Sequence, residues 1–149
     1  MSAEHMVSIL KECGARMGIV DWAFNEHGLC HFMVDDSRLF SLYHDTNEGT
    51  VVLVGQLLSE LPEQVGGPWL ERLLSMALNP MTGAGPGVGW DPELALVGYH
   101  TLNASRLCVE TFEVELADFI DWINALSQQL DDLEASHGIP RAREGQVLI

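Results

Sequence analysis

Basic residues are scarce in this 149-residue chain, and their scarcity excludes whole classes of function. Seven lysines and arginines stand against 22 aspartates and glutamates, which gives a formal net charge of −15. Such a chain repels phosphate backbones and anionic membrane surfaces. We therefore expect neither nucleic acid nor a membrane among its partners. The same charge keeps a protein in solution while it exposes apolar patches.

Cysteines are also few, and no apolar run is long enough to cross a bilayer. Cys13, Cys30 and Cys108 form no Cys-x-x-Cys pair, and their odd number completes no disulfide framework. Each lies in a periodic apolar run, so we expect reduced, buried and unreactive thiols. The first residues lack the basic and apolar regions of a signal peptide, so the expected location is the cytoplasm.

Apolar residues, by contrast, make up 47% of the chain, which predicts a folded single domain. Residues 28–58 hold three short apolar runs separated by turns rich in Asp, Asn and Gly, which predict an antiparallel meander. Alternation along the strands places apolar residues on both faces. One face carries Cys30, Phe32, Val34, Phe40 and Leu42, and the other carries Leu29, Met33, Leu39 and Tyr43. Because a sheet facing water normally keeps one face polar, a helix of the chain, a second subunit or a partner must cover the second face.

Three amphipathic or apolar segments predict helices. Residues 3–17 show helical spacing of apolar positions between charges. A second helix begins at Pro68, stops at Asn79-Pro80, and has only Glu71 and Arg72 as charges, which predicts burial in the core or against a second copy. The last helix keeps its spacing from Leu107 to Leu133 and is expected to end at Gly138 and Pro140.

Between the second and third helices lies a glycine-rich stretch, residues 81–89, followed by a predicted strand at 94–99. A phosphate-binding loop follows a strand and carries lysine, whereas this stretch follows a helix and has none, so we expect a flexible connector. The fold class is therefore α+β, with an antiparallel twisted sheet flanked by three helices in the order α-βββ-α-ββ-α. Residues 1–138 are expected to form one domain and residues 139–149 a flexible tail.

Catalytic and metal-binding signatures are missing from the sequence. On a strand, His27 and His31 would share a face, but neither a second ligand pair nor a His-Glu-x-x-His helix accompanies them. There is no Gly-x-Ser-x-Gly motif, and paired acids such as Asp35-Asp36 are typical of turns. We expect no catalytic residue, no metal and no cofactor.

The element order and several local patterns together resemble the Tir-chaperone, or CesT-type, family of class I type III secretion chaperones. The resemblance covers residues 5–136. It rests on His27 to Phe32 followed by Asp35 to Leu39, on Leu57-Leu58 to Leu61-Pro62, on Leu73-Leu74 to Leu78-Asn79, and on Phe119-Ile120-Asp121-Trp122. These patterns consist of apolar and turn residues at matching positions, and none of them is a catalytic or ligand-binding motif.

The resemblance implies a virulence-related homodimer in the bacterial cytoplasm that holds the N-terminal segment of an effector extended, soluble and competent for secretion. The secretion-system ATPase is a further expected partner. Carried over by position, the effector-binding residues would be Ile9, Leu10, Cys13, Met17, Leu29, Met33, Leu39 and Tyr43. The dimer interface would contain Trp69, Leu70, Leu73, Leu74, Ala77 and Trp90.

Two other functions stay open at this point. The first is an acidic immunity or inhibitor protein that binds one folded toxin, because a charge of −15 suits a basic nuclease. The second is an adaptor that has a chaperone-like fold without a role in secretion. Alternatives also stay open for single residues. The apolar residues of the first helix and Trp69 would equally fit a hydrophobic core without a role in binding. A helix of the same chain, in place of a client, would equally cover the second face of the sheet.

Overall fold

The computed structural model describes residues 3–19, 21–60, 63 and 66–142, with only the course of the backbone for 134–142. The predicted order of helices and strands is confirmed, with one short helix and one 3₁₀ turn in addition. The elements are α1 (Ala3–Met17), β1 (Leu29–Val34), β2 (Arg38–Asp45), β3 (Thr50–Leu58), α2 (Gly67–Ala77), α3 (Asn79–Thr82), β4 (Gly87–Asp91), β5 (Ala95–Asn103), η1 (Ala104–Arg106) and α4 (Val109–Ala142).

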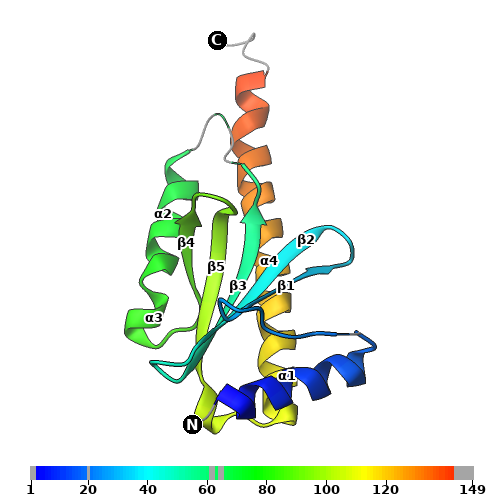
Figure 1. Ribbon diagram of the computed structural model, residues 1–149. Helices are drawn as coiled ribbons and strands as arrows, with labels where there is room; N and C mark the ends of the chain where they lie inside the picture. The colour runs from blue at the N-terminus through cyan, green and yellow to red at the C-terminus, as the bar shows by residue number, and fades with distance from the viewer. Residues whose placement is uncertain (1–2, 20, 61–62, 64–65, 143–149) are drawn as a thin grey trace.

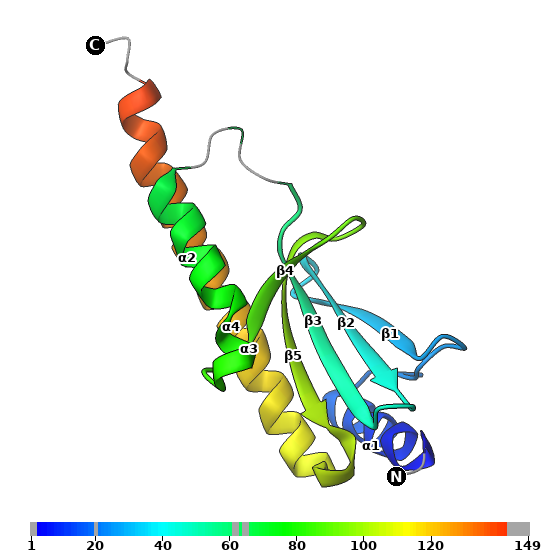
Figure 2. The same cartoon turned by 90° about the vertical axis from the view of Figure 1, so that its left-hand side faces the viewer.

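The five strands form one antiparallel sheet in the order β1-β2-β3-β5-β4. The meander of β1, β2 and β3 has the register expected from the sequence, and β5 inserts between β3 and β4. Helix α4 runs across one face of the sheet, and α2 lies beside β4 on the same side (Figures 1 and 2). Helix α1 lies across the end of the meander, near the start of α4 (Figure 1). None of the helices in the described ranges is both long enough and apolar enough to span a membrane.

Two facing glycines allow α4 to approach the sheet closely. Gly55 of β3 and Gly98 of β5 are partners in register, and both lie under α4. A Cβ atom at Gly98 would lie 2.6 Å from the side chains of both Ile123 and Trp122, and one at Gly55 would lie 2.9 Å from Ile123. These distances are shorter than van der Waals contact, so any side chain here would push the helix outward. The glycines therefore set the spacing between α4 and the sheet.

We expect Gly98→Ala to lower the free energy of unfolding by about 1–3 kcal/mol, because an added methyl group overpacks a filled core. Urea denaturation measures this change. Gly89→Ala on β4 is the matched control, because nothing lies within 4 Å of the position that its added methyl group would take. If both variants were equally stable, the close approach of α4 would have no energetic importance.

The second helix ends where the sequence predicted, because α2 ends at Ala77, just before Asn79-Pro80. A separate short helix, α3, begins at Asn79 with Pro80 in its first turn, where a missing N–H costs no hydrogen bond. Two other boundaries differ from the sequence-based expectation. Strand β4 begins at Gly87, so the glycine-rich connector is shorter than predicted. The predicted end of the last helix at Gly138 is wrong, because α4 continues to Ala142. A glycine costs a helix only about 1 kcal/mol relative to alanine and need not stop it. The rest of the predicted tail, residues 143–149, lies outside the described residues.

Candidate functional site

The sheet face opposite α4 carries apolar side chains. Over β1, β2 and β3 no helix of the described residues packs against this face (Figure 2), whereas at the β4 edge Pro80 of α3 lies over Gly87, beside Tyr99. Met33 is 56% exposed and Tyr43 is 38% exposed. Cross-strand pairing places Leu29 beside Tyr43 and Met33 beside Leu39. We call this surface the open face, and its members are Leu29, His31, Met33, Leu39, Ser41, Tyr43, Val52, Val54 and Tyr99. The prediction that Leu29, Met33, Leu39 and Tyr43 share one face of the sheet is confirmed.

The first helix contributes less to this surface than expected. Ile9, Leu10 and Cys13 are at most 4% exposed and belong to the core, so the expectation that they line an effector pocket needs correction. The reason is that α1 packs against the start of α4, where the Cys13 thiol donates to the Val109 carbonyl at 3.7 Å. Met17, at the end of α1, is 48% exposed and remains available for contacts.

The three cysteines are free, as the sequence predicted, but only two are buried. Burial, assisted by the nearby carboxylate of Glu113, raises the pKa of the Cys13 thiol to about 11. Burial also raises the pKa of Cys30. Both thiols therefore stay protonated and unreactive at neutral pH. Cys108 is exposed at the start of α4, which corrects the expectation that it is buried; its N–H donates to the Thr111 hydroxyl there.

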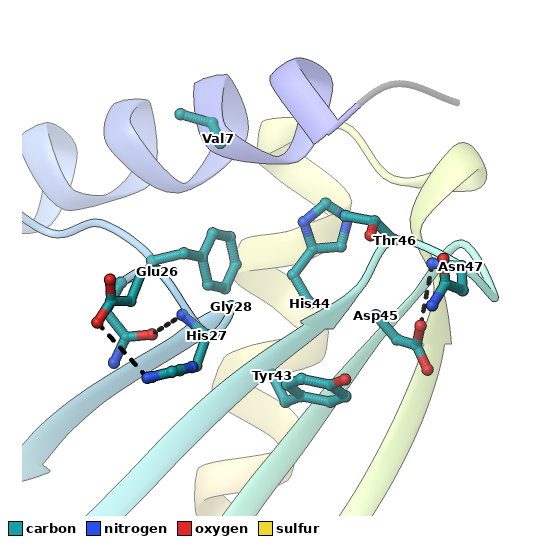
Figure 3. Close-up of a pocket in the computed structure, with 11 residues that line it drawn as sticks. Val7, Glu26, His27, Gly28, Tyr43, His44, Asp45, Thr46 and Asn47 are labelled. Atoms are coloured by element: carbon teal, nitrogen blue, oxygen red, sulfur yellow. Dashed lines mark hydrogen bonds and ion pairs between the residues drawn. The ribbon is translucent and has the colours of Figure 1, made fainter.

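A pocket of about 370 Å³ opens next to the open face (Figure 3). Val7 of α1, the turn from Phe24 to Gly28, and the end of β2 with its following turn line this pocket. Both turns are held by side chains: Asn25 accepts from the N–H groups of His27 and Leu29, and Asp45 accepts from those of Asn47 and Glu48. Because Tyr43 lines the pocket and also belongs to the open face, the two surfaces are continuous.

His44 is a buried, titratable residue in the wall of this pocket. The residue is only 7% exposed, and its ring centre lies 5.4 Å from that of Phe24. In Figure 3 the ring points towards α1, where Val7 lies. Burial lowers the pKa of His44, and the charge of Asp45 opposes this shift in part. The folded protein therefore holds His44 neutral at a pH where the unfolded chain begins to protonate it.

We expect the free energy of unfolding to fall as the pH drops through the ordinary histidine value of about 6.5, because the unfolded state then binds more protons than the folded state. The loss levels off once the pH is below the lowered pKa of His44. His44→Phe should reduce the slope of the unfolding free energy against pH by up to the contribution of one bound proton. Thr46→Val, at a residue of the same pocket that does not titrate, should leave it unchanged. Urea unfolding between pH 7.5 and 5 measures both slopes, and equal slopes for wild type and His44→Phe would contradict this account.

A second apolar surface lies at the other edge of the sheet. Leu70 and Leu74 of α2 and Leu78, the residue that caps its C-terminal end, recur every fourth residue, and Leu74 is 68% exposed. Nearby, Met81 of α3 and Trp90 of β4 are 83% and 56% exposed. We call this surface the outer face of α2; it consists of Leu70, Leu74, Leu78, Met81 and Trp90. Such a row of exposed large apolar side chains marks an interaction surface.

The predicted interface residues divide between this surface and the core. Leu70, Leu74 and Trp90 are exposed, and Ala77 is half-buried. Trp69 and Leu73 are 2% and 8% exposed and pack into the core of their own chain, so their assignment to an interface is corrected. Helical periodicity explains the division, because residues four apart share one face, whereas the next residue along is turned by about 100° around the helix axis.

Several residues of the site were not predicted. Val7 lines the pocket, and Val52, Val54 and Tyr99 extend the open face across β3 and β5. Val52 and Val54 could have been found by extending the strand period of two to residues 51–54, because every second side chain of a strand lies on the same face. The contribution of β5 had no such signal, because its pairing with β3 joins segments far apart in the sequence.

The histidines form no metal centre in the described part of the chain, where no three His, Cys, Asp or Glu residues are placed to hold an ion. His27 lies in a turn, 3.6 Å from Glu26, and its imidazole does not pair with that of His31. His31 instead contacts Ser41 on the neighbouring strand.

Several solved structures share this fold of an antiparallel five-stranded sheet with α-helices packed on one face. The chain is similar to a chain of the HopA1–SchA chaperone–effector complex, with a TM-score of 0.70 and 24% identity over 86% of this chain and 98% of that one. It is similar to a chain of the ExsC–ExsE complex, with a TM-score of 0.75 and 20% identity over 87% and 97%. A third similar structure is the Yersinia pestis type III secretion chaperone SycH in complex with a fragment of YscM2, with a TM-score of 0.61 and 19% identity over 80% and 98%.

The Tir chaperone protein (CesT) family model matches residues 8–127, and the chain belongs to this family. The comparison with curated proteins found no match. The resemblance inferred from the sequence is thus confirmed.

Proposed function

We propose that this protein is a type III secretion chaperone of the bacterial cytoplasm. It binds the N-terminal segment of a secreted effector in extended form and keeps that segment soluble and competent for secretion. Membership of the CesT family supports this function. Two of the similar structures support it as well: one is a chaperone–effector complex, and the other is a type III secretion chaperone bound to a protein fragment. The observation that carries the proposal is the open face, an apolar sheet surface in a chain with a net charge of −15.

An extended segment suits this surface for two physical reasons. Strand β1 is an edge strand, so its outer N–H and C=O groups beyond Leu29 can pair with an added strand, while those of Leu29 itself bond to Asn25. Apolar side chains of the segment would contact Leu29, Met33, Leu39 and Tyr43, with Met17 near the end of α1 as a further contact. Full burial of each large apolar side chain contributes about 1.5–3 kcal/mol.

The outer face of α2 is assigned to a second copy of the chain. Four of its five side chains are more than half exposed, which is unfavourable in water and is relieved by pairing with a copy of itself. Leu70, Leu74 and Trp90 would be central to this homodimer. The secretion-system ATPase would then meet the dimer with its effector bound, and not the isolated chain.

Capture of the tagged protein from its native bacterium, followed by mass spectrometry and limited proteolysis, tests the function. The expected result is one secreted protein whose N-terminal stretch is protected in an extended form by two copies of this chain. Recovery of an intact folded toxin in a one-to-one complex would instead identify an inhibitor, and the family would then describe only the fold. Recovery of a partner that is not secreted would point to an adaptor.

A further inference from the structure

A polar pair interrupts the open face at its centre. His31 of β1 and Ser41 of β2 are cross-strand partners, and the imidazole Nδ1 lies 2.6 Å from the Ser41 hydroxyl oxygen. Along the same strands and on the same face, this pair lies between two apolar pairs, Leu29 with Tyr43 and Met33 with Leu39. The open face therefore presents an apolar, a polar and an apolar row in succession.

The direction of the hydrogen bond follows from burial. Ser41 is only 5% exposed, and among the described residues its hydroxyl has no partner other than His31. A buried hydroxyl whose proton finds no acceptor is unfavourable, so the Ser41 hydroxyl donates to Nδ1. The imidazole proton then lies on Nε2. Because His31 is exposed, this N–H is a donor on the open face.

We propose that His31 selects a neutral hydrogen-bond acceptor in the bound segment, at a position flanked by two apolar residues. This inference rests on the proposed function. In an extended chain, side chains that face the same way are two residues apart, so the segment would carry apolar residues at its first and fifth positions and the acceptor at its third. A side-chain amide meets this requirement, whereas a carboxylate is opposed by the net charge of −15. Ser41 is the positioning residue, because its hydroxyl holds the tautomer and orientation of the ring.

Binding of three labelled peptides measured by fluorescence polarisation tests the proposal. All three have leucine at the first and fifth positions and differ only at the third, which is asparagine, aspartate or leucine. We expect wild type to prefer the asparagine peptide over the leucine peptide by about fivefold, the effect of one hydrogen bond. His31→Leu should abolish or reverse this preference, and Ser41→Ala should reduce it.

Two further variants separate recognition from a purely structural role of the pair. His31→Gln retains a side-chain N–H donor and should keep part of the preference for asparagine. His100→Leu, at a histidine of β5 that faces Glu115 of α4 on the other side of the sheet, should not change it. Equal binding of all three peptides to wild type, tightest binding of the aspartate peptide, or an unchanged preference in His31→Leu would overturn the inference and leave the proposed function standing. Failure of every peptide to bind wild type would count against both.

Discussion

Met33→Asp is expected to weaken binding of the captured effector segment at least about tenfold while the protein stays folded. Met33 is 56% exposed on the open face, so the carboxylate is hydrated in the free protein. In the complex it would be covered by apolar side chains of the segment and lose that hydration, which costs more than the roughly 1.4 kcal/mol that corresponds to tenfold in affinity. Isothermal titration calorimetry measures the affinity, and thermal unfolding monitors the fold.

The matched control is Val114→Asp on α4. Val114 is 60% exposed, close to the value for Met33, but it lies outside the open face. This variant should bind the segment like wild type. Unchanged affinity in Met33→Asp would show that the effector binds elsewhere, and unfolding of Met33→Asp would show that the open face is covered within the chain.

Leu74→Arg is expected to convert the proposed homodimer to a folded monomer, whereas Leu73→Arg should prevent folding. The two residues are neighbours on α2, but Leu74 is 68% exposed and Leu73 is 8% exposed. An arginine at Leu74 is hydrated in the monomer and buried without a partner only in the dimer. At Leu73 the charge is buried in the core of the single chain, which costs several kcal/mol, comparable to the total stability of a domain. Sedimentation velocity reports the mass, and circular dichroism reports the fold.

Ser75→Arg serves as the control for charge on α2. Ser75 is exposed and lies outside the stripe formed by Leu70, Leu74 and Leu78, so this variant should remain a dimer. A dimeric Leu74→Arg variant would remove the outer face of α2 from the interface. A folded Leu73→Arg variant would mean that α2 can leave the core without loss of the fold.

Short-range patterns were sufficient to predict most of the elements. Alternation in residues 29–43 identified both faces of the meander, because a strand turns its side chains by half a revolution at each residue whatever it packs against. Helical spacing identified α1, α2 and α4 for the same reason. The end of α2 before Asn79-Pro80 was found, but the end of α4 was not, since Gly138 changes the local energy by only about 1 kcal/mol, which the rest of the helix can override.

The candidate site was predictable only in part. Leu29, Met33, Leu39 and Tyr43 were found because they share one alternating segment. Ile9, Leu10 and Cys13 have the same apolar character but are buried, and no feature of their own spacing distinguishes a helix face that meets α4 from one that meets a partner. The pairing of His31 with Ser41 depends on strand register, which the intervening turn sets.

By itself, the sequence determined the class of fold, the family, the charge that disfavours nucleic acid, and the apolar character of both sheet faces. Only the tertiary structure decided which apolar surfaces are covered within the chain. Gly55 and Gly98 admit α4 to one face of the sheet, so that face becomes the core and the opposite face stays open. Whether a face is buried depends on which other element packs against it in the folded chain. The spacing of apolar residues in one helix or strand shows only that its face is apolar, not which element or partner covers that face.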